Sequence, residues 1–198
     1  KLIENNGDLE VFCRSLAVEP FITVDLEFLR EKTYYAKLCL IQVGSQHECA
    51  IIDPLAPEMN LQPFFELMDN PQIVKVFHAG RQDLEIIYFM HHRIPAPLFD
   101  TQVAAQVCGY GESVGYETLV NSLLNLELDK SFRFTNWEAR PLDKRQLEYA
   151  ICDVTHLVPI YLKLQDILKQ TGREGWVKEE IEHLSDPSVY ETNPLDVW

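Results

Sequence analysis

An apolar run over residues 21–28, FITVDLEF, carries two acidic residues in its middle. Its continuous apolar character predicts a buried strand. Asp25 and Glu27 are two residues apart, so on a strand both side chains point to the same face. Buried acids are costly, and they are rare unless they are paired or bound to a metal. The run therefore indicates a charged partner for both acids, unless they lie in solvent at a strand end.

Two further acids lie where their local structure would direct them toward the same point. Asp83 follows a predicted strand and the turn HAGRQ, which places it in the first turn of a helix, where the dipole favours an anion. Asp153 lies four residues after Tyr149 on a predicted helix, so the two share one face. Taken singly, helix capping explains Asp83 and a surface pair explains Tyr149 and Asp153. Only the combined order of these segments favours one joint site.

Four converging carboxylates repel one another unless cations join them. Oxygen-rich clusters suit Mg²⁺ or Mn²⁺, and a pair of such ions promotes in-line displacement at phosphorus. The pattern predicts two divalent ions and chemistry at a phosphate. The candidate metal ligands are Asp25, Glu27, Asp83 and Asp153, with Tyr149 beside them.

The spacing of apolar residues predicts an α/β fold with a mixed five-stranded sheet. The first three strands are joined by short connections, which favours an antiparallel meander. Later strands alternate with helices, which favours parallel strands covered by helices. Strands are expected over residues 21–28, 37–43, 48–52, 73–77 and 98–99. Helices are expected over residues 9–16, 61–68, 82–90, 101–107, 116–124 and 144–170, with Gly172 ending the last.

Length and composition fit one soluble globular domain, because 198 residues that are 46% hydrophobic can bury a full core. No apolar run approaches the roughly 20 residues of a membrane span, and the N-terminus has no signal-peptide core. No membrane partner is therefore expected. The five cysteines, an odd number without C-x-x-C, indicate free thiols and a cytoplasmic protein.

The net charge of −14 argues against a generic nucleic-acid-binding surface, which would be basic. The charge is unevenly distributed: residues 174–198 hold seven acids and one lysine, whereas residues 130–145 hold five basic and two acidic residues. A local basic strip is therefore available for phosphates. For Arg140 a structural pairing is an equal alternative, since arginine suits both tasks. The candidate phosphate contacts are Arg81, Lys130, Arg133 and Arg140.

Six segments of the chain resemble the DEDD exonuclease superfamily, in the branch with tyrosine in the third motif, and within it ribonuclease D. W-x-x-R-P-L is the most specific of them. The branch with histidine would place that residue one position earlier, at Glu148. The segments are TVDLEF (23–28), YYAKLCLIQV (34–43), KVFHAGRQDLE (75–85), LFDTQVAA (98–105), NWEARPL (136–142) and QLEYAICDVTHL (146–157).

This resemblance implies a ribonuclease H-like fold and a metal-dependent 3′→5′ exoribonuclease. Such an enzyme releases nucleoside 5′-monophosphates from single-stranded RNA 3′ ends, among them tRNA precursors. It also implies a catalytic domain over residues 1–172 and an acidic helix or linker over residues 173–198. The helical accessory domain of longer ribonuclease D proteins is expected to be absent.

The resemblance also implies roles for individual residues. Asp25 would bridge both metal ions, Glu27 and Asp153 would complete the site that activates water, and Asp83 would support the second ion. Tyr149 would orient the attacking water, rather than act as a base, because its ordinary pKa is near 10. For His78, a hydrogen bond that fixes the turn is favoured over metal ligation. Leu26, Phe28 and Tyr34 are candidates to stack on terminal bases, although most such residues belong to a core.

Three other functions remain open. A DNA 3′→5′ exonuclease of the Werner or proofreading type uses the same chemistry, and no residue reveals a contact to the 2′-OH that distinguishes RNA. An inactive nucleic-acid-binding scaffold is possible on the same fold, but it would not require all five site residues. A polymerase-associated subunit could use the acidic tail for docking.

Overall fold

A mixed six-stranded sheet forms the centre of the computed structural model, which describes residues 1–30, 35–128 and 135–191. The strand order is β1-β4-β3-β2-β5-β6. Strands β2, β3 and β4 form the predicted antiparallel meander, and β5 and β6 extend it in parallel. The strands are β1 (Leu2–Ile3), β2 (Phe21–Leu29), β3 (Lys37–Gly44), β4 (Cys49–Ile52), β5 (Val74–Phe77) and β6 (Leu98–Asp100).

The prediction of five strands is corrected by β1, which pairs in parallel with β4 at the edge of the sheet. Two residues are too few to show the alternation that marks a strand in a sequence. β1 is a strand only because it pairs with β4, and the sequence of these two residues does not reveal that pairing.

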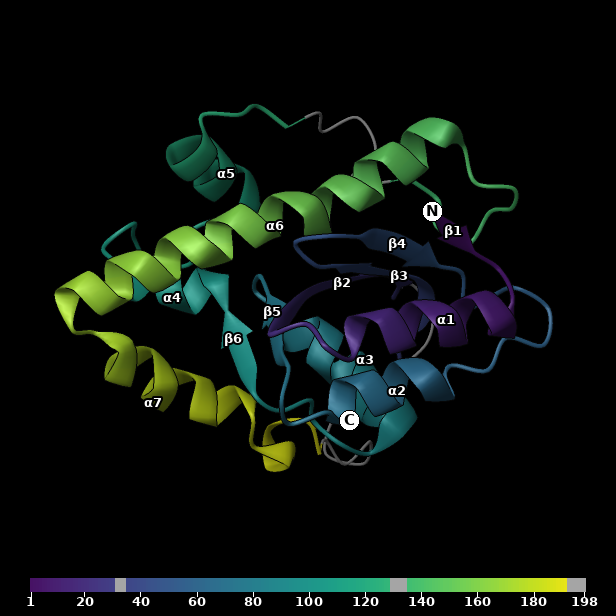
Figure 1. The fold of residues 1–198 in the computed structure, drawn as a ribbon, viewed down its shortest axis with the longest axis horizontal. Helices are drawn as coiled ribbons and strands as arrows, with labels where there is room; N and C mark the ends of the chain where they lie inside the picture. The colour runs from purple at the N-terminus through teal and green to yellow at the C-terminus, as the bar shows by residue number, and fades with distance from the viewer. Residues whose placement is uncertain (31–34, 129–134, 192–198) are drawn as a thin grey trace, which may run out of the picture.

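Helices cover both faces of the sheet (Figure 1). The longest helix crosses one face, and the first three helices cover the other. Each predicted helix is present, with ends shifted by a few residues at most. The helices are α1 (Asn6–Leu16), α2 (Gln62–Asp69), α3 (Arg81–His91), α4 (Thr101–Val107), α5 (Tyr116–Leu124), α6 (Lys144–Thr171) and α7 (Glu174–Leu184), followed by a 3₁₀ turn (Pro187–Val189).

Residues of β2 alternate between two environments. Ile22, Val24 and Leu26 are buried in the core formed with α1, α2 and α3. Phe28 packs against the same core, and the alternate residues of the strand face α6, where the apolar packing is divided. One cluster under the start of α6 contains Trp137 and Ala150, and a second under its later turns contains Leu157 and Leu164, among others. The acids of β2 lie on the face of the sheet that α6 covers.

Helix α6 approaches the sheet closely at Gly44. A Cβ there would lie 2.8 Å from the Thr23 hydroxyl and 3.3 Å from Cβ of Val154. The single O–H of Thr23 is shared between two backbone carbonyls, those of Val154, at 2.9 Å, and Gly44, at 3.2 Å. These contacts fix the turn of α6 that carries Asp153 against β2, two residues from Asp25.

The segment after Gly172 packs on the rest of the fold over its described part. Helix α7 buries Val177 and Ile181 in the second cluster under α6. Tyr190 is buried as well, and its hydroxyl donates to the Leu184 carbonyl at 2.7 Å. The segment up to residue 191 is therefore not an extended linker, whereas the domain boundary at residue 172 stays a prediction. Among the described helices, none has the length and apolarity needed to cross a bilayer.

Candidate active site

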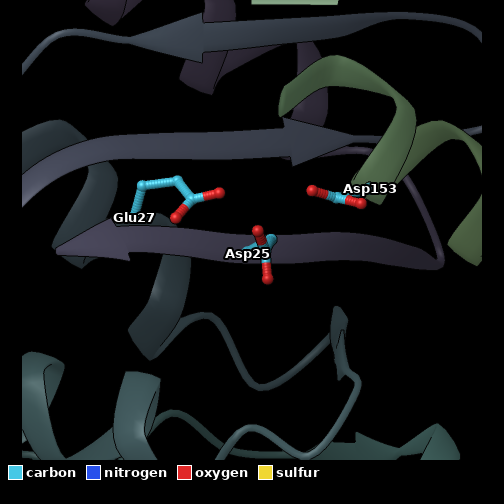
Figure 2. A group of neighbouring side chains, drawn as sticks. All are labelled: Asp25, Glu27 and Asp153. Carbon is cyan, nitrogen blue, oxygen red and sulfur yellow. The ribbon is translucent and has the colours of Figure 1, made fainter. Parts of the chain in front are cut away.

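Three of the four predicted metal ligands converge (Figure 2). Asp25 and Glu27 extend from β2 and Asp153 extends from α6, and one carboxylate oxygen of each lies within 4.8 Å of the other two. The two-residue spacing on β2 and the crossing of α6 produce this cluster. A shift in strand pairing follows directly after Glu27, and such bulges often lie beside active sites.

The three clustered acids line a cleft. Asp83 lines this cleft too but is not a member of the three-acid cluster. It lies in the first turn of α3 and is buried. The charge of Asp25 acts on it, after burial, to raise its pKa. Asp83 therefore belongs to the same electrostatic site as the cluster.

The turn HAG that precedes α3 is held by Asp100, which also caps α4. Its carboxylate accepts hydrogen bonds from the backbone N–H groups of Ala79, at 3.1 Å, and Gly80, at 2.8 Å. Ala79 has a φ of +53°, and a Cβ on Gly80 would lie 2.6 Å from Cβ of Phe77. This tight turn sets the direction in which α3 presents Asp83.

His78 fixes the same turn to α4. Its Nδ1 lies 2.9 Å from the Thr101 hydroxyl, which in turn donates to the Phe77 carbonyl at 3.1 Å. The hydroxyl therefore accepts from the ring N–H. The structure thus shows the hydrogen bond that fixes the turn, and burial lowers the pKa of His78.

Tyr149 lines the cleft from α6 and packs beside Trp137, with ring centroids 6.1 Å apart. Trp137 is buried and belongs to the W-x-x-R-P-L segment, which leads into the N-cap of α6 at Asp143. The motif next to the predicted metal ligands thus supports the tyrosine that precedes Asp153 by one turn.

Arg140 of the same segment pairs with Asp53 at the end of β4. Nε and one terminal nitrogen of Arg140 donate to the two Asp53 oxygens, each at 2.7 Å. The remaining donors reach the backbone carbonyls of Trp137, Ala139 and Cys39. A guanidinium has five N–H donors, and all five have acceptors here. The structural pairing is therefore the alternative that the structure shows for Arg140.

Of the other candidate substrate contacts, some line the cleft and others do not. The cleft has a volume of about 640 Å³, within the range of small-ligand sites. Phe28 and Leu26 both line this cleft. Phe28 is half-buried, whereas Leu26 is only 4% exposed and also belongs to the core. Arg81 is exposed on α3 and is not part of the described cleft lining. Tyr34, Lys130 and Arg133 lie outside the described residues.

Tyr116 was not predicted as a site residue. It lines the cleft from α5, and its hydroxyl donates to the backbone carbonyl of Asp153. Asp53, which pairs with Arg140, was not predicted as a site residue either. Both act on the site across 37 or more residues of sequence, and no local pattern in the chain signals such contacts.

A family model described as a 3′-5′ exonuclease matches residues 1–169. The chain belongs to this 3′-5′ exonuclease family. Over 198 residues, the exonuclease domain is 52% identical to a protein named Ribonuclease D from Sphingobium indicum, an alignment that covers all of this chain and 51% of that relative. The chain spans about half the length of the curated relatives that it matches.

Solved structures resemble the exonuclease domain in the same way. Escherichia coli RNase D, described as an exoribonuclease involved in structured RNA processing, superposes with a TM-score of 0.92 at 35% identity, over 98% of this chain and 51% of that one. Brucella melitensis NrnC with bound Mg²⁺ superposes with a TM-score of 0.76 at 25% identity, over 88% and 85% of the two chains. These matches confirm the predicted ribonuclease H-like fold and the resemblance to ribonuclease D.

The donor set of the exonuclease domain fits a divalent cation, and the family is metal dependent. All three clustered ligands are carboxylate oxygens, the donors that Mg²⁺ and Mn²⁺ prefer. Burial raises the pKa of Asp25 to about 7, of Asp153 to about 8 and of Glu27 to about 10, and the repulsion among these acids adds to the shift of Glu27 and Asp153. A bound cation would relieve both the repulsion and the protonation.

Metal-free exonuclease domain is expected to lose stability as the pH rises from 5 to 8. The folded-state pKa values of Asp25 and Asp153 lie above the ordinary value of 3.8. Their contribution is fully present below about pH 4 and is lost as the pH rises through about 7 to 8, because the unfolded chain ionises first. Thermal unfolding in EDTA at stepped pH measures this decline.

Added Mn²⁺ should raise Tm more at pH 8 than at pH 6, because the metal competes with protons for the same oxygens. The affinity for Mn²⁺ should rise about tenfold per pH unit for each proton displaced. A Tm in EDTA that stays constant from pH 5 to 8 would contradict the burial of the carboxylate cluster.

Proposed function

We propose that this exonuclease domain hydrolyses RNA from free 3′ ends with two divalent ions, and that it releases nucleoside 5′-monophosphates. The convergence of Asp25, Glu27 and Asp153, with Asp83 in the same cleft, carries this proposal. The names of the ribonuclease D relatives support RNA as the substrate.

Each acid has a place in this proposal. Bound divalent ions would lower the pKa of a water and neutralise charge that develops on the phosphate. Asp25, at the centre of the cluster, would contact both ions, while Glu27 and Asp153 would hold the ion on their side. Asp83, across the cleft on α3, would hold the second ion, in part through water.

Tyr149 would orient the attacking water with its phenol. Replacing Tyr149 with phenylalanine should lower kcat by about 10²-fold, the lower end of a general acid–base contribution, with little change in the affinity for Mn²⁺. Steady-state kinetics measure kcat, and calorimetric titration measures the affinity for Mn²⁺. Equal losses in kcat and in Mn²⁺ affinity would mean that Tyr149 helps to hold the metal instead.

The natural substrates are proposed to include tRNA precursors with extended single-stranded 3′ ends, and the place of action to be the cytoplasm. All five cysteines are free thiols, which fits a reducing compartment. The two proposals rest on the resemblance to ribonuclease D and on these thiols.

The choice of RNA over DNA is tested with matched single strands. The domain is incubated with RNA and DNA of one sequence, and with a tRNA precursor that has a 3′ extension, each with Mn²⁺. The proposal expects RNA to be shortened faster than DNA, and the extension to be removed. Faster cleavage of DNA would indicate a DNA exonuclease, and binding of RNA without cleavage would indicate an inactive scaffold.

A further inference from the structure

Gln42 of β3 lies beside the carboxylate cluster. The strand register pairs it directly with Asp25, and opposed residues of an antiparallel pair point to the same face, with Cβ atoms about 4.5–5.5 Å apart. On its other side Gln42 pairs with Ile51, which belongs to the apolar cluster under α6. The amide is therefore placed between the acids and the apolar packing, beneath α6.

The Gln42 side chain is completely buried, and its amide is unsatisfied. Neither its oxygen nor its nitrogen has a hydrogen-bond partner within the described part of the chain. Buried amides without partners are costly and uncommon. Leucine or methionine would fill this position without that cost, so the amide indicates a partner that arrives with a ligand.

In the strand register, the acceptor directly opposite Gln42 is the carboxylate of Asp25. Its two oxygens offer about four lone-pair positions, so ligation of cations and one amide hydrogen bond can be accommodated together. Positions that face Glu27 and Asp153 are those available to cations. Gln42 lies directly opposite Asp25 on the neighbouring strand β3.

We propose that Gln42 is a positioning residue of the metal site, whose amide N–H donates to the Asp25 carboxylate when divalent ions are bound. The inference rests on the proposed metal site and assigns a residue that orients one of its ligands. Carboxylates that hold metals are themselves commonly fixed by such hydrogen bonds. Gln42 thereby sets the direction of the Asp25 lone pairs before RNA binds.

The test replaces Gln42 with methionine, which has nearly the same length and no amide. Mn²⁺ affinity is measured by calorimetry on the whole chain, and Tm is measured in EDTA. We expect Mn²⁺ to bind about 10- to 100-fold more weakly. Tm in EDTA should stay equal or rise by about 2–4 °C, because an unsatisfied amide has been removed. With RNA and saturating Mn²⁺, kcat should fall while KM stays unchanged.

Leu40→Met serves as the matched control, because Leu40 lies on the same strand and face, opposite Glu27. It should leave the Mn²⁺ affinity unchanged. If Gln42→Met lowers Tm in EDTA and binds Mn²⁺ as the wild type does, Gln42 has only a structural role. That result contradicts the role proposed for Gln42 and leaves the proposed metal site standing. If the wild-type chain itself binds no Mn²⁺, both the proposed metal site and the role of Gln42 are contradicted.

Discussion

Replacement of Asp25 by asparagine should lower the rate of RNA hydrolysis by about 10³-fold or more, because loss of a metal ligand removes several kcal/mol of transition-state stabilisation. Asp25 has the central position, since it faces Glu27 and Asp153 and also raises the pKa of Asp83. The fold should remain intact. In EDTA at pH 8, above the pKa of about 7 of Asp25, the variant should unfold at a higher temperature than the wild type, because it lacks the charge of this acid.

Asp166→Asn is the matched control, since Asp166 is an exposed acid on α6. It should keep wild-type turnover and Tm. Rates are measured at saturating Mn²⁺ to separate metal affinity from chemistry. An Asp25→Asn variant with near-wild-type turnover would show that the cluster is not the catalytic site.

Replacement of Arg140 by methionine should reduce the free energy of unfolding by about 3–5 kcal/mol, the usual effect of removing one partner of a buried ion pair. Asp53 is almost completely buried, with 3% of its side chain exposed, and would keep an uncompensated charge. Three backbone carbonyls would lose their donors as well. Urea unfolding measures the change. Catalysis should also weaken, because the segment that carries Trp137 supports Tyr149.

Arg93→Met is the control for the second prediction. Arg93 pairs with Asp69 through a side chain that is 69% exposed, and exposed pairs contribute about 0–1 kcal/mol. Arg140→Lys should fall between the two, because lysine keeps the charge but not the paired hydrogen bonds. An Arg140→Met variant as stable as Arg93→Met would mean that the pairing does not anchor the motif.

Local periodicity was sufficient to predict much of the fold and of the acidic cluster. The alternation along β2 placed Asp25 and Glu27 on one face, and the turn after β5 placed Asp83 at the start of a helix. These predictions succeed because a strand has a period of two and a helix start is marked by its cap.

Contacts between distant segments were beyond the reach of such patterns. Arg140 and Asp53 are separated by 87 residues, so whether Arg140 binds phosphate or another side chain depends on the packing of α6 against the sheet. Gln42 looks like a polar interruption of an apolar strand until the register sets it opposite Asp25. Tyr116 reaches Asp153 only because α5 packs beside α6.

A time course on 5′-labelled single-stranded RNA, with Mn²⁺ and with EDTA, tests the central claim most directly. A circular RNA of the same sequence serves as the substrate without a 3′ end. The account predicts a ladder that shortens from the 3′ end of the linear RNA, released 5′-monophosphates, an intact circle and no cleavage in EDTA. Cleavage of the circle, or undiminished cleavage in EDTA, would contradict a metal-dependent 3′→5′ exonuclease at this site.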